Sequence, residues 1–396
     1  MTCGSEELFD VVVVGGGPAG ATAAHELVTA GRSVLLLDKG GRIKPCGGAI
    51  PPRLIRDFAI PEELLCAQIR SARMVAPSQR QVDMPIDGGY VGMVNREVFD
   101  EFLRQRAATA GALRRTGVFE RIERDESDAA LVHYRTATGA GVVRARLVIG
   151  ADGALSQVAR QEIDEKGPAY VFAYHEIVRL PEAATPPSFD GARCDVVYDG
   201  TISPDFYGWV FPHGSTASVG SGSAKKGFGL RGSVSALRAA SGLSGCETLR
   251  REGAPIPMKP LLRWDNGRDV LLAGDAAGVV APASGEGIYY AMVGGQLAAR
   301  AGGEFLDSGD ARALRRARKL FMQAHGRVFW ILGIMQHFWY KNDRRRERFV
   351  SICRDPDVQT LTWQAYMNKE LVRARPAAHL RIFLKDVGHL LGIGSP

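Results

Sequence analysis

The hydrophobic pattern near the start of the chain predicts a strand, a turn, a helix and a second strand. Val11–Val14 form an uninterrupted β-branched run, which is typical of a strand buried on both faces. Ala19–Ala30 is rich in small residues and favours a helix, and Ser33–Leu37 forms a second apolar run. This succession predicts one βαβ unit with parallel strands and therefore an α/β fold.

Two later segments repeat part of this pattern. Leu147–Ile149 and Val270–Ala273 are short apolar runs, and each leads into a loop that contains an aspartate and glycines. A helix-like segment follows each loop, the second one from about residue 287. Both runs are predicted to join the same parallel sheet. The loops that follow them then lie at its carboxyl edge, where open α/β sheets bind ligands.

The stretch SPDFYGWVFP, residues 203–212, has a different period. Its aromatic residues Tyr207, Trp209 and Phe211 alternate with other residues, so a strand would carry all three on one face. Such a face is a broad apolar wall. It fits either a binding surface for an apolar ligand or a sheet face packed against the core, and the pattern alone leaves both open.

From residue 311 onward, apolar residues at helical spacing stand beside clusters of basic residues. The apolar run Val328–Trp339 is shorter than the ~20 residues that span a bilayer. The pattern fits a helical region that either contacts a membrane surface or packs on the main body. The basic residues are Arg315, Arg316, Arg318, Lys319, Arg344, Arg345, Arg346 and Arg348.

Composition limits which binding partners, metal sites and compartments the protein can have. The 396 residues carry a formal net charge of +7, and they are enough for two domains. No nucleic-acid recognition motif accompanies the charge, so we expect no nucleic-acid partner. The six cysteines show no metal-ligand or disulfide spacing, so we expect reduced thiols in the cytoplasm and no metal. The acidic start differs from a secretory signal.

The turn after the first strand has the spacing G-x-G-x-x-G at Gly15, Gly17 and Gly20. The first glycine permits a tight turn, the second lets a pyrophosphate approach the backbone, and the third allows close helix–strand packing. Pro18 and Ala19 begin the helix, whose free N–H groups attract phosphates. The turn therefore predicts a dinucleotide site and leaves FAD and NAD(P) both possible.

An acidic residue stands where a ribose would be bound. Asp38 ends the second strand and is followed by Lys39, and we expect both at the cofactor. The later loops add Asp152 with Gly153 and Gly274 with Asp275. Asp275 is placed to accept a hydrogen bond from a ribityl hydroxyl. The GEG turn is expected to present backbone N–H groups to the flavin or pyrophosphate through Gly285, Gly287 and Ile288.

With these three motifs in order, the chain resembles the glutathione-reductase-type flavoproteins of the aromatic-hydroxylase group. The resemblance implies FAD as cofactor. It also places Arg96, in NREVFDEFLRQRAATAGA, where a guanidinium contacts FAD, although a surface arginine at a helix start fits the same position.

The stretch P-x-x-Y-x-W-x-F-P, which ends at Pro212, resembles the fingerprint of geranylgeranyl reductases. KPCGGAI, with Cys46, Gly47 and Gly48, resembles their Cys-Gly-Gly element. Together with the FAD motifs, the similarity covers most of residues 8–300. Within the family the chain looks most like the reductases of bacteriochlorophyll and chlorophyll synthesis.

This resemblance implies the reaction and the partners. NADPH would drive reduction of three of the four double bonds of a geranylgeranyl chain, carried on (bacterio)chlorophyll or as the free diphosphate, to give phytyl. We expect a cytoplasmic protein in peripheral contact with a photosynthetic membrane, and we make no prediction of its oligomeric state. Alternatives are a reductase of another polyprenyl lipid, an aromatic hydroxylase or halogenase, and a non-catalytic flavin-binding assembly factor.

The role of Cys46 has three interpretations. In a glycine-flanked loop near a flavin it could relay a proton as a catalytic residue, act as a packing element beside the cofactor, or be a buried inert thiol. The glycines Gly47 and Gly48 are interpreted as room for the flavin ring. Lys44 is either a phosphate ligand or a solvated side chain. Tyr207, Trp209, Phe211 and Pro212 are predicted to bind the substrate chain.

The predicted domains are discontinuous. Residues 1–70, 96–165 and 265–310 are expected to form a glutathione-reductase-type, Rossmann-like FAD domain. Residues 71–95 and 166–264 are expected to form an antiparallel sheet for the substrate, of α+β character. Residues 311–396 are expected to be a basic helical region.

Overall fold

The computed structural model describes residues 7–41, 45–163, 165, 167–181 and 188–369. The chain forms two compact units, each built from three separate segments. Unit 1 contains residues 1–44, 96–170 and 255–330, and unit 2 contains residues 45–95, 171–254 and 331–396. Each unit has its own sheet structure.

Unit 1 contains a seven-stranded sheet with the order β8-β2-β1-β11-β10-β9, and β17 also pairs with β11. Its strands are β1 (Leu8–Val14), β2 (Val34–Asp38), β8 (Leu113–Thr116), β9 (Val118–Arg124), β10 (Ala130–Thr136), β11 (Gly139–Gly150) and β17 (Val270–Leu272). Strands β8, β2, β1, β11 and β17 are parallel, and β9 and β10 are antiparallel additions. Val12 lies opposite both Leu35 and Val148 in register, which makes β1 a central strand.

The central position explains the uninterrupted apolar run. Val11, Val12 and Val13 have no exposed surface, and burial of each such side chain favours folding by about 1.5–3 kcal/mol. The predicted first helix is observed as α1 (Pro18–Thr29), one residue earlier at each end than the sequence pattern suggested. The other helices of unit 1 are α3 (Arg96–Thr109), α4 (Gln157–Glu162), η2 (Gly274–Ala277), α6 (Ile288–Ser308) and η3 (Ala311–Leu314).

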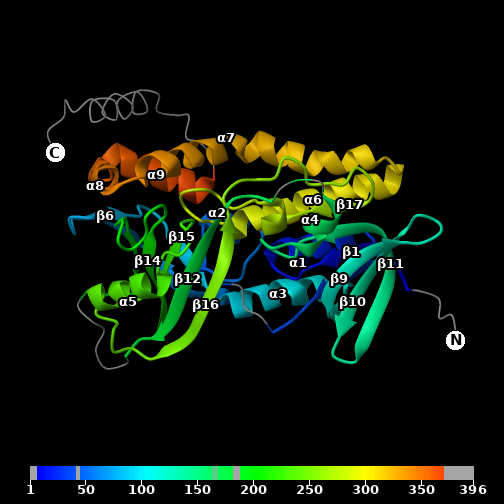
Figure 1. Cartoon of the computed structure of the whole chain (residues 1–396), viewed down its shortest axis with the longest axis horizontal. Helices are drawn as coiled ribbons and strands as arrows, with labels where there is room; N and C mark the ends of the chain where they lie inside the picture. The colour runs from blue at the N-terminus through cyan, green and yellow to red at the C-terminus, as the bar shows by residue number, and fades with distance from the viewer. Residues whose placement is uncertain (1–6, 42–44, 164, 166, 182–187, 370–396) are drawn as a thin grey trace. The chain divides into compact units, whose positions relative to one another are not determined.

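Helices α1 and α6 pack unusually closely, beside the parallel strands (Figure 1). A methyl group added at Gly295 would lie 2.3 Å from the carbonyl oxygen of Ala19. No side chain larger than hydrogen fits there, because the backbone of α1 occupies the space. The small residues of both helices therefore set their separation.

Unit 2 contains a second seven-stranded sheet, in the order β16-β12-β15-β14-β13-β5-β6, and a three-stranded sheet, in the order β3-β7-β4. The strands are β3 (Ala49–Ile50), β4 (Leu65–Ile69), β5 (Ser71–Val75), β6 (Gln81–Pro85), β7 (Val91–Val94), β12 (Tyr170–Arg179), β13 (Arg193–Val197), β14 (Gly208–His213), β15 (Thr216–Ser223) and β16 (Thr248–Pro257). The helices before residue 331 are α2 (Pro52–Asp57), η1 (Glu62–Leu64) and α5 (Leu230–Ala240).

The larger sheet of unit 2 has one face covered by α5. Val210 and Val219 from the sheet and Val234 and Leu237 from α5 share one buried apolar cluster. Neighbouring strand residues point to opposite faces, so the face away from α5 carries Trp209 and Phe211. This division confirms the predicted alternation for Trp209 and Phe211, whereas Tyr207 directly precedes the strand.

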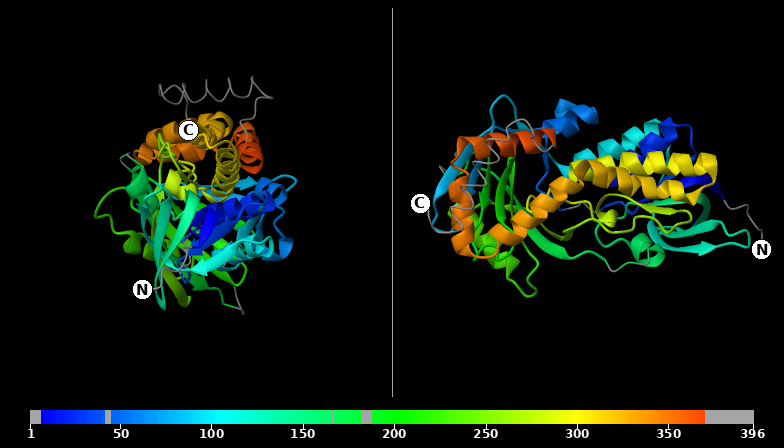
Figure 2. Two further views of the ribbon diagram at one scale, coloured as in Figure 1. Left: turned by 90° about the vertical axis from the view of Figure 1, so that its right-hand side faces the viewer. Right: turned by 90° about the horizontal axis from the view of Figure 1, so that it is seen from above.

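The region after residue 311 is helical, as predicted, through α7 (Arg315–Trp339), α8 (Asp343–Ile352) and α9 (Pro356–Asn368). The part of α7 up to residue 330 runs beside α6 (Figure 2), and the rings of Tyr290, Phe321 and Phe329 contact one another between the two helices. Not all of the predicted basic residues are on the surface. Arg346 is only 2% exposed. Its guanidinium donates hydrogen bonds to Asp343 and to the carbonyl oxygens of Pro204 and Tyr340.

The division of the chain differs from the predicted domains at two places. Residues 45–70 were assigned to the FAD domain but belong to unit 2, because β3 and β4 both pair with β7. The helical region is not separate, since residues 311–330 belong to unit 1 and residues 331–369 to unit 2. The end of the predicted region, residues 370–396, lies outside the described residues, as does Lys44.

Candidate functional site

The predicted nucleotide turn is packed against the end of β11. Gly15 has φ +103°, and a methyl group there would lie 2.4 Å from the carbonyl oxygen of Ala151. A methyl group at Gly20 would lie 1.9 Å from the carbonyl oxygen of Gly15. At Gly17, in contrast, a methyl group would meet no atom within 4 Å. The turn thus has free space beside its second glycine, where a pyrophosphate was predicted to approach.

The start of α1 fits an anion. Gly17 is the N-cap residue, with no side-chain cap, and Pro18 occupies the first turn. The backbone N–H groups of this turn and the helix dipole favour a negatively charged group. Arg104 of α3 adds a positive charge nearby, because its guanidinium donates to the carbonyl oxygen of Gly16 at 3.1 Å. The donors present therefore fit the pyrophosphate of a dinucleotide.

Asp38 orders the loop beside this turn. Its carboxylate accepts hydrogen bonds from the backbone N–H of Gly16 at 2.7 Å and of Gly40 at 2.9 Å. Each carboxylate oxygen has a second lone pair, so contact with a ribose hydroxyl is chemically compatible with these bonds. Lys39 is exposed. The cofactor contacts of both residues stay predictions.

The second motif contributes more to local structure than expected. The Asp152 carboxylate accepts hydrogen bonds from the Ser156 hydroxyl at 2.5 Å and from the backbone N–H groups of Gln157 at 2.7 Å and Val158 at 3.3 Å, so it caps α4. Burial raises its pKa, and these hydrogen bonds oppose that effect. Gly153, at φ +88°, would place a methyl group in open space. Of the two, Gly153 leaves more room for a ligand.

The third motif lies against the first. Gly274 has φ +64°, and a methyl group there would lie 2.6 Å from the Cβ of Ala19. The next residue, Asp275, is buried in η2. A methyl group at Gly287 would lie 3.8 Å from the Asp275 Oδ1. The structure therefore brings the GD motif, the GEG turn and the start of α1 together in unit 1.

The GEG turn leads directly into α6. Gly285 has φ +65°, a conformation that favours glycine. Gly287 is the N-cap residue of α6, which begins at Ile288, and the Glu286 carboxylate accepts a hydrogen bond from the Tyr289 N–H at 3.2 Å. The turn thus ends in a second helix N-terminus close to the first, which suits a cofactor with phosphate and polar ring atoms.

Arg96 begins α3 but is not a surface arginine. It is 6% exposed, and its guanidinium donates two hydrogen bonds of 2.7 Å to the Asp100 carboxylate. The surface interpretation of Arg96 is therefore wrong. A bidentate pair holds the guanidinium in one orientation, and its contact with FAD stays a prediction.

In unit 2, the Cys-Gly-Gly element lies along the aromatic strand. A methyl group at Gly47 would lie 2.9 Å from the Phe211 ring, and one at Gly48 would lie 2.5 Å from the His213 ring. Burial raises the pKa of Tyr207, which precedes this strand. The two family-like stretches, far apart in the sequence, thus form one structure.

The aromatic residues of this strand lie in a row. The ring centroids of Tyr207 and Trp209 are 6.1 Å apart, and those of Trp209 and Phe211 are 6.3 Å apart. We call these three residues the aromatic stripe. Pro212 occupies an alternate position with Val210, whose side chain lies in the cluster beneath α5. The predicted contact of Pro212 with substrate therefore does not fit the strand geometry.

His213 continues the stripe and was missed from the sequence. Its Nε2 lies 3.1 Å from the Gly47 carbonyl oxygen, and its Nδ1 lies 3.2 Å from Asn95 Oδ1 and 3.5 Å from Cys66 Sγ. Burial lowers the pKa of His213 to about 4, so the ring is neutral near pH 7. The alternation that predicted Tyr207, Trp209 and Phe211 on one face would have predicted His213 as well, because it is the next alternate residue.

Cys46 itself has a defined setting. Its Sγ accepts a hydrogen bond from the Gly48 N–H at 3.3 Å, which closes a tight turn, and the side chain is half-buried. It is therefore not a fully buried, inert thiol. The proton-relay and packing interpretations of Cys46 both stay predictions. So do the predicted cofactor contacts of Cys46, Gly47 and Gly48, which belong to unit 2, whereas the nucleotide motifs belong to unit 1.

Other features of the described residues carry no site. Within them, no three His, Cys, Asp or Glu side chains are grouped as metal ligands, and the five described cysteines are free. None of the helices in the described ranges is long and apolar enough to cross a membrane.

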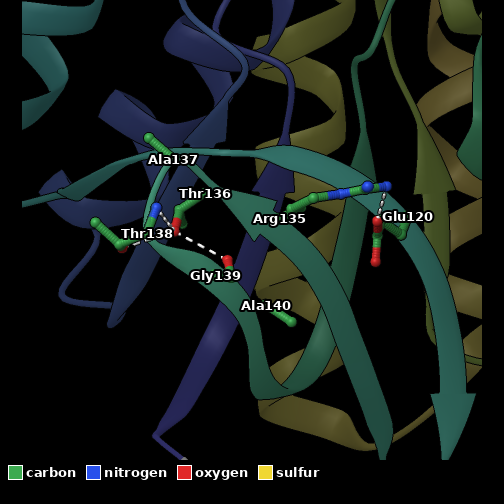
Figure 3. A pocket seen from close by; sticks show the side chains of 7 residues that line it. All are labelled: Glu120, Arg135, Thr136, Ala137, Thr138, Gly139 and Ala140. Carbon is green, nitrogen blue, oxygen red and sulfur yellow. Dashed lines mark hydrogen bonds and ion pairs between the residues drawn. The ribbon is translucent and has the colours of Figure 1, made fainter.

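A pocket in unit 1 lies at the turn between β10 and β11 (Figure 3). It is lined by Glu120 and residues 135–140, among which Arg135 pairs with Glu120. This turn lies at one end of the twelve-residue strand β11, and Gly150, beside the predicted nucleotide site, lies at the other end. The pocket is thus remote from the predicted cofactor site.

Comparisons with known proteins agree with this arrangement. Residues 8–188 match the family model described as FAD binding domain. The chain is similar in structure to a geranylgeranyl bacteriochlorophyll reductase-like protein from Thermoplasma acidophilum, with TM-score 0.80 and 23% identity over 94% of this chain and 99% of that one. A flavin-dependent brominase has TM-score 0.75 at 17% identity over 96% and 99% of the two chains, so these two structures show the shared fold alone.

Sequence relatives narrow the family. A geranylgeranyl diphosphate reductase of Rhodobacter capsulatus is 56% identical over 98% of this chain and 99% of the relative. One from Synechocystis is 36% identical over 96% and 97%. A digeranylgeranylglycerophospholipid reductase of Methanoculleus marisnigri is 31% identical over 76% and 78%. Because the similarity extends over nearly the whole length at high identity, the chain belongs to the geranylgeranyl diphosphate reductase family and carries its FAD-binding domain.

Proposed function

We propose that the protein is an FAD-dependent oxidoreductase that uses NADPH to reduce three of the four double bonds of a geranylgeranyl chain to phytyl in bacteriochlorophyll biosynthesis. The chain is carried on a bacteriochlorophyll or chlorophyll precursor or as the free diphosphate. The observation that carries this proposal is the aromatic stripe with the Cys-Gly-Gly element packed along it, in a chain with an FAD-binding domain. The names of the relatives support the same reaction.

The glycine-rich turns of unit 1 would hold the cofactor. The start of α1 at Gly17 suits the pyrophosphate, and Asp275 with the start of α6 suits the ribityl chain and ring. When bound and reduced by NADPH, the flavin would supply the hydride that one carbon of the double bond accepts. Arg104 and the two helix N-termini contribute positive potential for this anionic cofactor.

The aromatic stripe would bind the substrate chain. An isoprenoid is wholly apolar, and three adjacent rings offer it dispersion contacts and exclude water. An isolated alkene is a poor hydride acceptor, so one carbon of the double bond must take a proton. Cationic character then develops at the other carbon, which accepts the hydride, and aromatic faces stabilise it. Tyr207 and Trp209 are therefore assigned to chain binding.

The proton must come from a group beside the stripe. The Cys46 Sγ is fixed by the Gly48 N–H, and the neighbouring Gly47 lies against the Phe211 ring of the stripe, so we assign Cys46 as the proton relay. His213 is neutral and hydrogen-bonded to the Gly47 carbonyl oxygen, and we assign it to holding this turn in place. Each reduced double bond gains two hydrogens, one as hydride and one as proton. One NADPH is oxidised to NADP+ for each double bond that is reduced.

The test is anaerobic incubation of the FAD-loaded protein with NADPH and geranylgeranyl-bacteriochlorophyll, followed by mass analysis of the prenyl tail. Stepwise gains of two hydrogens are expected, and a parallel reaction with geranylgeranyl diphosphate identifies the preferred carrier. An unchanged tail on both substrates would refute the proposal. Oxygen consumption coupled to NADPH would indicate a hydroxylase, and bound FAD with no NADPH oxidation would indicate an assembly factor.

Two variants test the assigned residues. Trp209→Ala is expected to weaken use of the substrate while FAD stays bound, and loss of FAD would show that the stripe has another role. Cys46→Ser and Cys46→Ala are expected to slow reduction of every target bond. Unimpaired reduction by both would remove Cys46 as the proton relay and leave its packing role.

We also propose peripheral contact with a membrane through the exposed face of α7. Lys319, Arg327 and Trp330 are exposed on this helix, the first two about two turns apart and the third about one turn further on, and Trp330 is 69% exposed. A basic helix face that carries an exposed tryptophan is suited to an anionic bilayer surface. Flotation with anionic vesicles is expected to carry the parent protein, and Trp330→Ser with Arg327→Gln is expected to reduce flotation. Equal flotation of parent and variant would refute this contact.

A further inference from the structure

A hydrogen-bonded series of polar side chains, buried except for the half-buried Glu252, begins at Trp209 of the aromatic stripe. Trp209 Nε1 donates to the Ser218 hydroxyl at 3.1 Å, Ser218 Oγ lies 2.9 Å from His175 Nδ1, and His175 Nε2 lies 2.9 Å from Glu252 Oε2. These residues stand on β14, β15, β12 and β16, four strands that are adjacent in the sheet. This hydrogen-bonded series therefore crosses four of the seven strands of the larger sheet of unit 2, on the face that carries the stripe.

Each hydrogen bond of this series can be assigned one donor and one acceptor without conflict. With the proton of His175 on Nε2, that nitrogen donates to the Glu252 carboxylate and Nδ1 accepts from the Ser218 hydroxyl. The Ser218 oxygen can then accept from the indole N–H of Trp209. Each hydrogen is used once, and His175 and Ser218 are both buried. Such a satisfied buried network holds its members in one arrangement.

Gly220 makes this arrangement possible. It lies directly opposite His175 on β12 and opposite Trp209 on β14. A methyl group there would lie 2.1 Å from the Trp209 ring and 2.7 Å from the Cβ of His175. Without a side chain at this position, the two rings lean across β15 until their centroids are 6.3 Å apart.

We propose that Glu252, His175 and Ser218 are positioning residues that fix the indole plane of Trp209 and thereby set how far the prenyl chain advances along the stripe. This inference rests on the proposed function. The indole N–H is bonded to the sheet and the residue is only 6% exposed, so a substrate would meet the ring in one fixed plane. If the Trp209 indole rotated freely, the prenyl chain would bind at several positions along the stripe. Products with fewer reduced double bonds would then accumulate.

The experiment compares Ser218→Ala with Ser221→Ala in the FAD-loaded protein. Ser221 is a matched control, because it is also fully buried on β15 but donates to the Ile202 carbonyl oxygen instead. Ser218→Ala is expected to raise the ratio of partly to fully reduced product by about 3- to 10-fold, the range expected from one lost hydrogen bond. Ser221→Ala is expected to leave this ratio unchanged, and Ser218→Thr, which keeps the hydroxyl, to restore it.

A second readout needs no substrate. The indole N–H resonance of Trp209, identified by its absence in Trp209→Phe, is expected to shift in Ser218→Ala and not in Ser221→Ala. In the Trp209→Phe background, adding Ser218→Ala should change the product ratio no further.

An unchanged ratio in Ser218→Ala, or a change that persists without Trp209, would overturn the inference. A parent protein that reduces no prenyl chain would refute the proposed function instead, and the indole resonance would still decide whether Ser218 holds Trp209.

Discussion

The two glycines at the start of α1 should respond in opposite ways to the same substitution. Gly20→Ala places a methyl group 1.9 Å from the Gly15 carbonyl oxygen, so the backbone of the turn must move. Overpacking of this kind costs about 1–3 kcal/mol, and contact with backbone rather than a flexible side chain favours the upper end. The free energy of unfolding of the apoprotein should therefore fall by about 3 kcal/mol.

Gly17→Ala should leave stability nearly unchanged but weaken FAD binding. Gly17 has φ −74° and ψ −176°, which alanine adopts readily, and its methyl group would meet no protein atom within 4 Å. The weaker N-cap and the stiffer unfolded chain offset each other to within about 1 kcal/mol. A methyl group in the phosphate space should cost at least one charged hydrogen bond, about 10- to 150-fold in affinity.

The assays are chemical denaturation of the apoprotein and titration with FAD followed by flavin fluorescence. Stability must be measured without FAD, since a bound cofactor stabilises the folded state by mass action. The reasoning would be refuted if Gly17→Ala bound FAD as tightly as the parent protein, because the open space would then not receive the pyrophosphate. A stable Gly20→Ala apoprotein would contradict the packing argument.

Three further predictions concern packing, pH and the C-terminal helices. Gly295→Ala should lower the melting temperature because its methyl group would lie 2.3 Å from the Ala19 backbone, whereas Gly303→Ala, in open space on the same helix, should raise stability by about 1 kcal/mol. Burial lowers the pKa of His213 to about 4, so the unfolded chain binds the proton first. Chemical denaturation should therefore show that, between about pH 6.5 and pH 4, the free energy of unfolding of the parent protein falls by about 3 kcal/mol more than that of His213→Gln. Equal decreases in the two proteins would contradict this argument. Arg346→Lys should cost about 3 kcal/mol in the same assay because carbonyl oxygens buried with it lose their donors, while the exposed Arg344→Lys should change stability by less than about 0.5 kcal/mol.

The sequence predicted the first βαβ unit closely because its pattern is local. The apolar runs, the small-residue helix and the glycine turn each depend on neighbours within a few residues. The helix and the second strand lie within one residue of their predicted bounds, and the first strand begins three residues earlier than predicted. The fold of the relatives and of similar structures agrees with the predicted α/β class. Pairing between strands distant in sequence has no such local signal.

Two of the contacts that sequence reasoning missed are long-range. Arg104 reaches Gly16 across 88 residues, and His175 reaches Glu252 across 77. A lone histidine in a strand gives no sign of which carboxylate it will face, because sheet order decides this and alternation along one strand does not. The same reason explains why residues 45–70 were assigned to the wrong part of the chain, since their partner strand β7 lies further along the sequence.

The Cys-Gly-Gly element and the aromatic strand had been interpreted separately, the first as room for a flavin and the second as a wall for a chain. In the structure, Gly48 has φ +73° and faces the His213 ring, and Gly47 faces Phe211. The protein itself therefore favours both glycines, whatever cofactor lies nearby, because a side chain would collide with the Phe211 ring at Gly47 and with the His213 ring and the Val94 carbonyl oxygen at Gly48. The two stretches of this chain thus pack together because the two residues after Cys46 have no side chains.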